Sequence, residues 1–119
     1  MSMIPKFRAF LKDAKKIVDV EIIFFELCAV KLTNNKFYEF EDIILMQSTG
    51  LHDKHGVEIF EGDILTSQDG TDGLISRFIV KRDEFYTGFT PMNREGYGFN
   101  RTMCEVIGDV RQQSELLEV

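Results

Sequence analysis

Hydrophobic and polar residues alternate along much of this chain, which is the pattern of β-strands that bury one face. Residues Lys6 to Phe10 alternate in this way, and Val18 to Ile22 do so within a run from Ile17 to Leu32 that is rich in Val, Ile and Phe. Because β-branched and aromatic side chains favour strands, the pattern predicts strand for this run, with residues 11–16 as the hairpin loop before it. Beyond Ile22 both faces are apolar, which predicts that part of the run is buried on two sides or covers a partner.

Turn-forming residues divide the rest of the chain into further strands. Residues 33–36 (TNNK) are a turn signal, and Asp53–Gly56 and Glu61–Asp63 are expected to bend sharply, with Gly56 supplying a left-handed backbone. Residues 69–73 (DGTDG) are interpreted as a hairpin tip, because the two glycines offer positive-φ positions. They are not a phosphate-binding loop, because the GK[ST] motif is absent and the two acids would repel a phosphate group.

The strand signals recur at short intervals after residue 43, which indicates a small antiparallel barrel or sandwich. The first 42 residues are expected to form a smaller β-rich lobe packed on it, because a chain of 119 residues is too short for two independent cores. The prediction is therefore one structural unit over residues 1–119, with an N-terminal lobe at 1–42 and a barrel lobe at 43–119.

The net charge of −6 and the pI near 4.9 narrow the range of partners. An acidic surface repels phosphate groups, and no run of Lys and Arg exceeds two residues, so non-specific nucleic-acid binding is disfavoured. No apolar run is longer than Ile22–Phe25, which is far too short to span a bilayer, and charges interrupt the N-terminus where a secretory signal would be apolar. We therefore expect a cytoplasmic protein with no membrane partner.

The two cysteines, Cys28 and Cys104, both lie in apolar runs and form no CxxC pair. Zinc sites need four ligands at short spacings, which these cysteines and the two histidines do not supply. We expect both to be buried free thiols in a reducing compartment.

Polar residues around the central turns are the first candidates for chemistry. Four carboxylates lie close together and two histidines stand beside them: Asp53, Glu58, Glu61, Asp63, His52 and His55. The carboxylates lack the alternate spacing of a calcium loop, and no Ser or Cys nucleophile lies near the histidines in sequence. Acidic residues at turns usually serve turn geometry, so we predict no catalytic, metal or cofactor site and no enzyme activity.

Aromatic residues and arginines are interleaved between residues 82 and 101, which makes this segment the best candidate for a binding surface. Its residues are Arg82, Phe85, Tyr86, Phe89, Arg94, Tyr97 and Arg101. On a small barrel such a set can contact a protein or stack the bases of single-stranded nucleic acid. Alternatively, the aromatic rings fill the barrel and the arginines solvate its rim. The acidic total charge favours this last interpretation or a protein partner over nucleic acid.

Three blocks of sequence, in order along the chain, carry a family resemblance. They are Ile4–Phe10 (IPKFRAF), Leu45–Ile64 (LMQSTGLHDKHGVEIFEGDI), and Val106–Val110 followed by Ser114–Leu117. Together they resemble the YopX family of small phage and prophage proteins, with Phe10 where that family has Trp. The middle block is highly specific, because a chance match over some twenty positions is not credible.

The resemblance implies a mainly β fold with an SH3-like barrel in the later part, and a phage or prophage gene product, but it implies no activity. We therefore predict a non-enzymatic accessory protein in the bacterial host cytoplasm, which contacts a host or phage protein or associates with itself. A single-stranded nucleic-acid-binding barrel is the alternative, and a metal-binding protein or enzyme is the least favoured.

Overall fold

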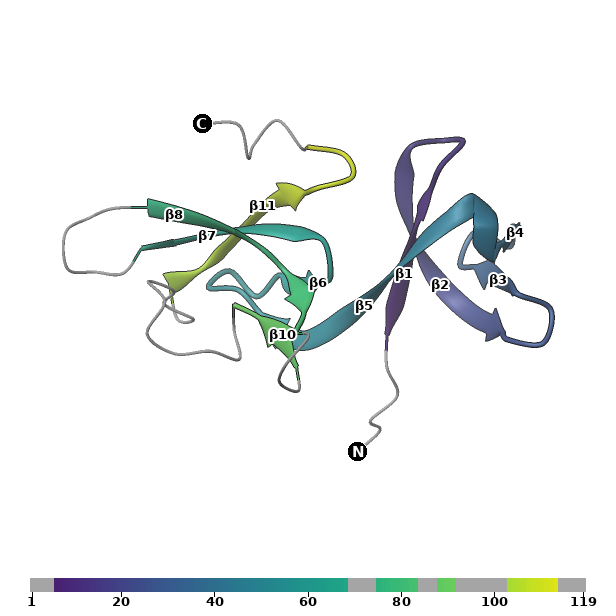
Figure 1. The fold of residues 1–119 in the computed structure, drawn as a ribbon, viewed down its shortest axis with the longest axis horizontal. Helices are drawn as coiled ribbons and strands as arrows, with labels where there is room; N and C mark the ends of the chain where they lie inside the picture. The colour runs from purple at the N-terminus through teal and green to yellow at the C-terminus, as the bar shows by residue number, and fades with distance from the viewer. Residues whose placement is uncertain (1–5, 69–74, 84–87, 92–102, 114–119) are drawn as a thin grey trace. The chain divides into compact units, whose positions relative to one another are not determined.

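The computed structural model describes residues 6–68, 75–83, 88–91 and 103–113 of the chain. The elements whose bounds lie within these residues are β-strands and the 3₁₀-helix η1 (Phe40–Asp42), and the described strand pairs are antiparallel (Figure 1). The mainly β fold predicted from the alternating pattern is confirmed. Within the same residues, no helix has the length and apolar character needed to cross a membrane.

The residue contacts divide the chain into two compact units, Met1–Ser48 and Thr49–Val119, named here unit 1 and unit 2. The division falls inside strand β5 (Ile43–His52), whereas the sequence pattern placed a boundary between residues 42 and 43. The pattern breaks at η1, just before β5 begins, but β5 itself contributes residues to both units.

Unit 1 is an antiparallel sheet with the strand order β4-β3-β2-β1-β5 (Figure 1). Its first four strands follow one another as hairpins, and β5 then returns to pair with β1. The bounds of these four are β1 (Phe7–Leu11), β2 (Lys16–Phe24), β3 (Ala29–Leu32) and β4 (Phe37–Glu39). The predicted loop at 11–16 is the β1–β2 turn, which is closed by the Lys15 N–H donating to the Leu11 carbonyl at 2.7 Å.

One face of the unit 1 sheet carries the core. Its fully or nearly fully buried residues are Ala9, Leu11, Val30, Leu32 and Ile43. Val30 lies opposite Tyr38 of β4, and Tyr38 packs against the same core. Because successive side chains of a strand point to opposite faces, Phe37 and Glu39 lie on the other, outer face of β4.

The predicted continuous strand over residues 17–32 is wrong in its middle. Strand β2 ends at Phe24 and β3 begins at Ala29, and the four residues between them form a tight turn. The Leu27 N–H donates to the Phe24 carbonyl at 3.2 Å, and Cys28 adopts a left-handed backbone with φ 51°. The turn contains no Gly, Pro, Asn or Asp, so the sequence carries none of the usual turn signals.

Unit 2 contains shorter strands. Its bounds are β6 (Glu58–Phe60), β7 (Asp63–Gln68), β8 (Ile75–Ile79), β9 (Lys81–Arg82), β10 (Phe89–Thr90) and β11 (Glu105–Asp109). Strand β7 lies between β11 and β8 in one sheet, β9 pairs with β10, and β6 lies next to β5. The buried core residues are Ile59, Leu65, Val80 and Cys104.

The described strands of unit 2 do not close into a barrel. The chain leaves the three-stranded sheet at Val80, whose N–H donates to the Asp63 carbonyl at 2.9 Å and whose carbonyl accepts the Gly62 N–H at 2.8 Å. These bonds hold Val80 beside the bend that precedes β7. Strand β8, before Val80, belongs to the three-stranded sheet, whereas β9, after it, pairs with β10 in a separate two-stranded sheet.

Candidate functional site

The turn after β5 uses its acidic residue to hold the backbone. Asp53 is buried, and its Oδ1 accepts the N–H groups of His55 at 2.8 Å and Val57 at 2.9 Å. Its Oδ2 accepts the N–H of Val106 in β11 at 2.9 Å, which ties the turn to a strand far along the chain. Gly56 completes the turn with φ 82°, as the sequence predicts.

These hydrogen bonds determine the charge state of Asp53. Burial raises the pKa of this carboxyl, but the N–H donors of Val106, Val57 and His55, together with the nearby His55 side chain, outweigh burial and lower it. The charged carboxylate is therefore the form that the fold stabilises. Such an acid holds structure rather than transferring protons at neutral pH.

A second of the four carboxylates around the central turns also accepts a backbone N–H group. Asp63 is buried at the start of β7, and its Oδ2 accepts the Phe60 N–H at 2.8 Å. His52 and His55 are both exposed, as expected, and the His55 Nε2 lies 3.6 Å from a carboxylate oxygen of Glu105. In the described part of unit 2, no group of three or more acidic, Cys or His residues is arranged to hold a metal.

The predicted binding surface is described only at two positions. Arg82 of β9 lies opposite Phe89 of β10, and its guanidinium carbon is 5.1 Å from the centre of the Phe89 ring. Phe89 packs partly against the unit 2 core while Arg82 is exposed. The other five predicted residues, Phe85, Tyr86, Arg94, Tyr97 and Arg101, lie outside the described residues.

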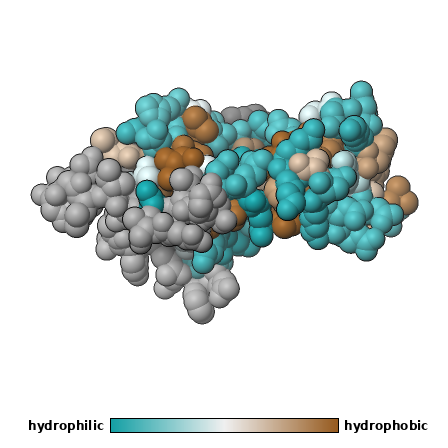
Figure 2. Space-filling view, turned by 90° about the horizontal axis from the view of Figure 1, so that it is seen from above, coloured by the Kyte–Doolittle hydropathy of each residue, from teal (hydrophilic) through white to brown (hydrophobic). Residues whose placement is uncertain are grey.

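Unit 1 presents large apolar side chains to solvent, and sequence reasoning did not identify this surface. They gather at the β2–β3 turn and on the outer face of β4, where Phe25 is 74% exposed, Leu27 72% and Phe37 65%. We call Phe24, Phe25, Leu27, Phe37 and Phe40 the tip surface. Figure 2 shows hydrophobic residues reaching the exterior at the right-hand end of the view. Single exposed apolar residues are common, but several together mark an interaction site.

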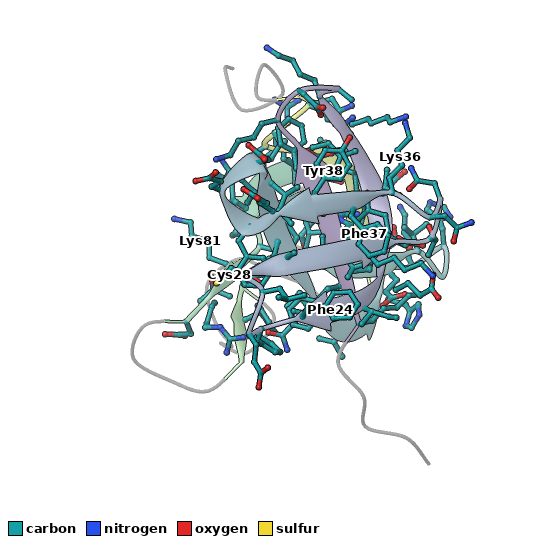
Figure 3. The ribbon with its side chains drawn as sticks, turned by 90° about the vertical axis from the view of Figure 1, so that its right-hand side faces the viewer. Phe24, Cys28, Lys36, Phe37, Tyr38 and Lys81 are labelled. Carbon is teal, nitrogen blue, oxygen red and sulfur yellow. The ribbon has the colours of Figure 1, made fainter. Side chains whose placement is uncertain are left out.

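The aromatic rings of the tip surface pair with one another, and Phe40 also packs against the unit 1 core. Phe24 and Phe37 come from β2 and β4, on either side of β3, and stack with ring centres 6.3 Å apart (Figure 3). Phe25 meets Phe40 edge to face at 6.4 Å. Such pairs fix the orientation of the rings, while one member of each pair, Phe37 and Phe25, stays largely exposed.

An open pocket of about 380 Å³ lies beside these rings. It is lined by Leu27, Cys28, Glu39, Phe40 and Glu41. The expectation that Cys28 is buried is wrong, because the turn places it on the surface (Figure 3). Cys104 is buried, as predicted. Both cysteines are free thiols.

Two acidic residues, Glu39 and Glu41, line the pocket, and Asp42 follows directly in the chain. One carboxylate oxygen from each of Glu39, Glu41 and Asp42 can be chosen so that the three lie within 4.8 Å of one another, and all three residues are exposed. The pKa of Glu39 is raised because its protonated carboxyl can donate a hydrogen bond to Glu41, and because the negative charges of Glu41 and Asp42 disfavour its ionised form. Within the described residues, no ion pair joins these carboxylates to a cation.

The sequence held one signal for this surface. Both faces of β2 become apolar after Ile22, and we expected two-sided burial or a covered partner there. Burial on both sides is wrong for the turn residues Phe25 and Leu27, which face solvent. The sequence pattern did not indicate that Phe37 and Phe40 belong to this surface. The face of the sheet on which each side chain lies depends on the position of the β3–β4 turn.

Comparisons with known proteins identify a similar solved structure and the family to which the chain belongs. The crystal structure of protein EF1440 from Enterococcus faecalis is similar over 98% of this chain and 99% of that chain, with 26% sequence identity and a TM-score of 0.70. No curated protein matches the chain. The family described as YopX protein matches residues 6–118, which is nearly the whole chain. The chain therefore belongs to the YopX family, as the three sequence blocks indicated.

Proposed function

We propose that this protein has no catalytic activity and acts by binding another protein through the tip surface. The observation that carries the proposal is the exposure of Phe25, Leu27 and Phe37 at one end of unit 1. Leaving such side chains in water forgoes roughly 1.5–3 kcal/mol each compared with full burial, so a partner that covers them gains that contribution. Aromatic side chains beside a pocket are also typical hot spots, the few residues that contribute most of the binding energy of a protein interface.

The setting of the proposal follows from the family. The resemblance to phage and prophage proteins implies a partner that is a host or phage protein in the bacterial cytoplasm. The buried acids of the unit 2 turns support the absence of catalysis, because Asp53 and Asp63 have oxygens occupied by backbone N–H groups.

Capture from host cell lysate, with the full chain as bait and nuclease present, tests the proposal when matched variants are compared. Leu27→Ser removes an apolar side chain from the tip surface, and Val57→Ser removes one from unit 2 that is 48% exposed. We expect a stoichiometric protein that is retained by the parent and by Val57→Ser but lost with Leu27→Ser. Equal retention by all three proteins, or retention of nothing, would count against the proposal.

Self-association is a second form of the same proposal. Sedimentation velocity over a wide concentration range would detect it, and the Leu27→Ser variant should then remain monomeric. Failure of the parent to associate at high concentration would leave only a different protein as partner.

Single-stranded nucleic-acid binding remains the alternative function, and one observation favours it. The Arg82 guanidinium stacked on Phe89 resembles the arginine–aromatic pairs that accept bases. Fluorescence anisotropy with labelled oligonucleotides at low salt tests it, because binding of this kind must weaken as salt rises. Binding that persists in Arg82→Ala would exclude this site.

For the fold we further propose that unit 2 is an SH3-like barrel. The antiparallel pairs β7–β8 and β9–β10 and the change of sheet at Val80 support it, because small barrels of this kind are built from short hairpins that pass between two sheets. An experimental structure that shows a ladder joining the two sheets would establish closure, and an open sheet edge would refute it.

A further inference from the structure

The pocket beside the tip surface combines two kinds of wall. Its lining includes the apolar residues Leu27 and Phe40 and the acidic residues Glu39 and Glu41. Its volume of about 380 Å³ has room for a large side chain. Pockets of this size are usually mostly apolar, with a few polar groups that decide what enters. Here those polar groups are carboxylates.

Within the described residues, no ion pair joins the carboxylates at the pocket to a cation. The Lys12 Nζ lies beside this cluster, but it donates to the backbone carbonyl of Glu41 at 2.8 Å rather than to a carboxylate. The carboxylates therefore act mainly on one another, in accord with the raised pKa of Glu39. A cation placed among them would relieve this repulsion and form charge-assisted hydrogen bonds.

The same charge weighs against two other occupants. Nucleic-acid phosphates would be repelled by Glu39, Glu41 and Asp42. A second copy that met this surface through a two-fold axis would set its own acids against these, because such an interface brings identical patches together. A basic partner suits the surface better than either.

We propose that the pocket binds a basic, apolar peptide segment of a partner protein. A large apolar side chain packs between Leu27 and Phe40, and a neighbouring Arg or Lys binds the carboxylates of Glu39 and Glu41. Arginine suits the site best, since its planar guanidinium can donate to two carboxylates and lie against an aromatic ring. This inference rests on the proposed function and adds the chemistry of the partner.

The test selects peptides without assuming their sequence. A random linear peptide library displayed on phage is panned against the full chain, and the enriched peptides are synthesised with a fluorescent label. We expect them to carry Arg or Lys next to a large apolar residue. Anisotropy should then show binding that weakens with rising salt, as exposed charge pairs are screened.

Two variants and one control assign the binding to the pocket. The double substitution Glu39→Gln and Glu41→Gln keeps the shape but removes both charges, and Leu27→Ser removes the apolar wall. We expect each to weaken binding roughly tenfold, while Val57→Ser binds like the parent. The substituted residues are exposed, so circular dichroism and thermal unfolding should show all variants folded.

The outcomes separate this inference from the proposed function. If Leu27→Ser abolishes capture of a lysate protein while the double glutamine variant retains it, protein binding stands and the basic-segment inference is overturned. Enrichment of acidic or uncharged peptides would also overturn it. So would the absence of any peptide that depends on Leu27, or dimerisation of the parent through the tip surface.

Discussion

The β2–β3 turn of unit 1 and the β5–β6 turn of unit 2 differ in what their side chains do. In the β5–β6 turn, Asp53 is buried and accepts three backbone N–H groups, and Gly56 supplies the left-handed residue. In the β2–β3 turn, Cys28 supplies it instead, and Phe25 and Leu27 face water. The β5–β6 turn therefore stabilises the fold, whereas the β2–β3 turn exposes apolar surface that stability does not require.

Among changes to the two turns, removing the Asp53 carboxylate should produce the largest effect on stability. Asp53→Ala leaves three N–H groups without their acceptor, two of them local to the turn and one in β11, so we expect a loss of about 3 kcal/mol in the free energy of unfolding. Urea denaturation measures it. Asp19→Ala, at an exposed acid of β2, is the control and should change little. Equal losses for the two variants would contradict the structural role of Asp53.

Substituting the left-handed residue of each turn should change stability by a smaller amount than Asp53→Ala. The two substitutions should act in opposite directions. Gly56→Ala should cost about 1 kcal/mol, because φ is 82° and no atom lies within 4 Å of the added Cβ, so only backbone strain opposes it. Cys28→Asn should gain a few tenths of a kcal/mol, since Asn tolerates this conformation better than Cys. Thermal unfolding of both variants measures the difference, and a stabilising Gly56→Ala would refute it.

The two acidic sites should also titrate in opposite directions. The pKa of Asp53 is lowered and that of Glu39 is raised, so NMR titration of their carboxyl carbons should place the Asp53 midpoint below that of an ordinary exposed Asp and the Glu39 midpoint above that of an ordinary exposed Glu. Because the folded pKa of Asp53 is depressed, its contribution to stability is present above its unfolded pKa and is lost as pH falls through the folded value. For Glu39 the raised pKa means that protonation relieves repulsion on lowering the pH.

Much of unit 2's turn geometry could be predicted from sequence, because its signals are local. Gly56 and the residues Glu61–Asp63 carry recognised turn chemistry within a few positions, and the structure places a turn at each. The bonding partner of Asp53 in β11 could not be predicted, since Val106 lies 53 residues away and its position depends on strand register. The sequence therefore indicated that Asp53 belongs to a turn without showing what else it holds.

The tip surface was missed for a different physical reason. Alternation assigns faces only while a strand continues, and the unsignalled turn after Phe24 ends that rule. Apolar residues from Phe24 to Leu27 then looked like core, because hydrophobicity alone does not distinguish a buried strand from an exposed interaction surface. Only the register of β2, β3 and β4 brings Phe24 beside Phe37.

The smallest expected effect on stability is the most informative about function. Leu27 is 72% exposed, so Leu27→Ser should change the free energy of unfolding by less than about 0.5 kcal/mol in urea denaturation. A buried residue of the same unit, Leu32, should lose about 2–5 kcal/mol as Leu32→Ala. If Leu27→Ser instead destabilised the protein as much as Leu32→Ala, Leu27 would belong to the core and its exposure would need no partner. If Leu27→Ser leaves stability unchanged while abolishing capture of a protein, the exposed Leu27 side chain contributes to binding and not to folding.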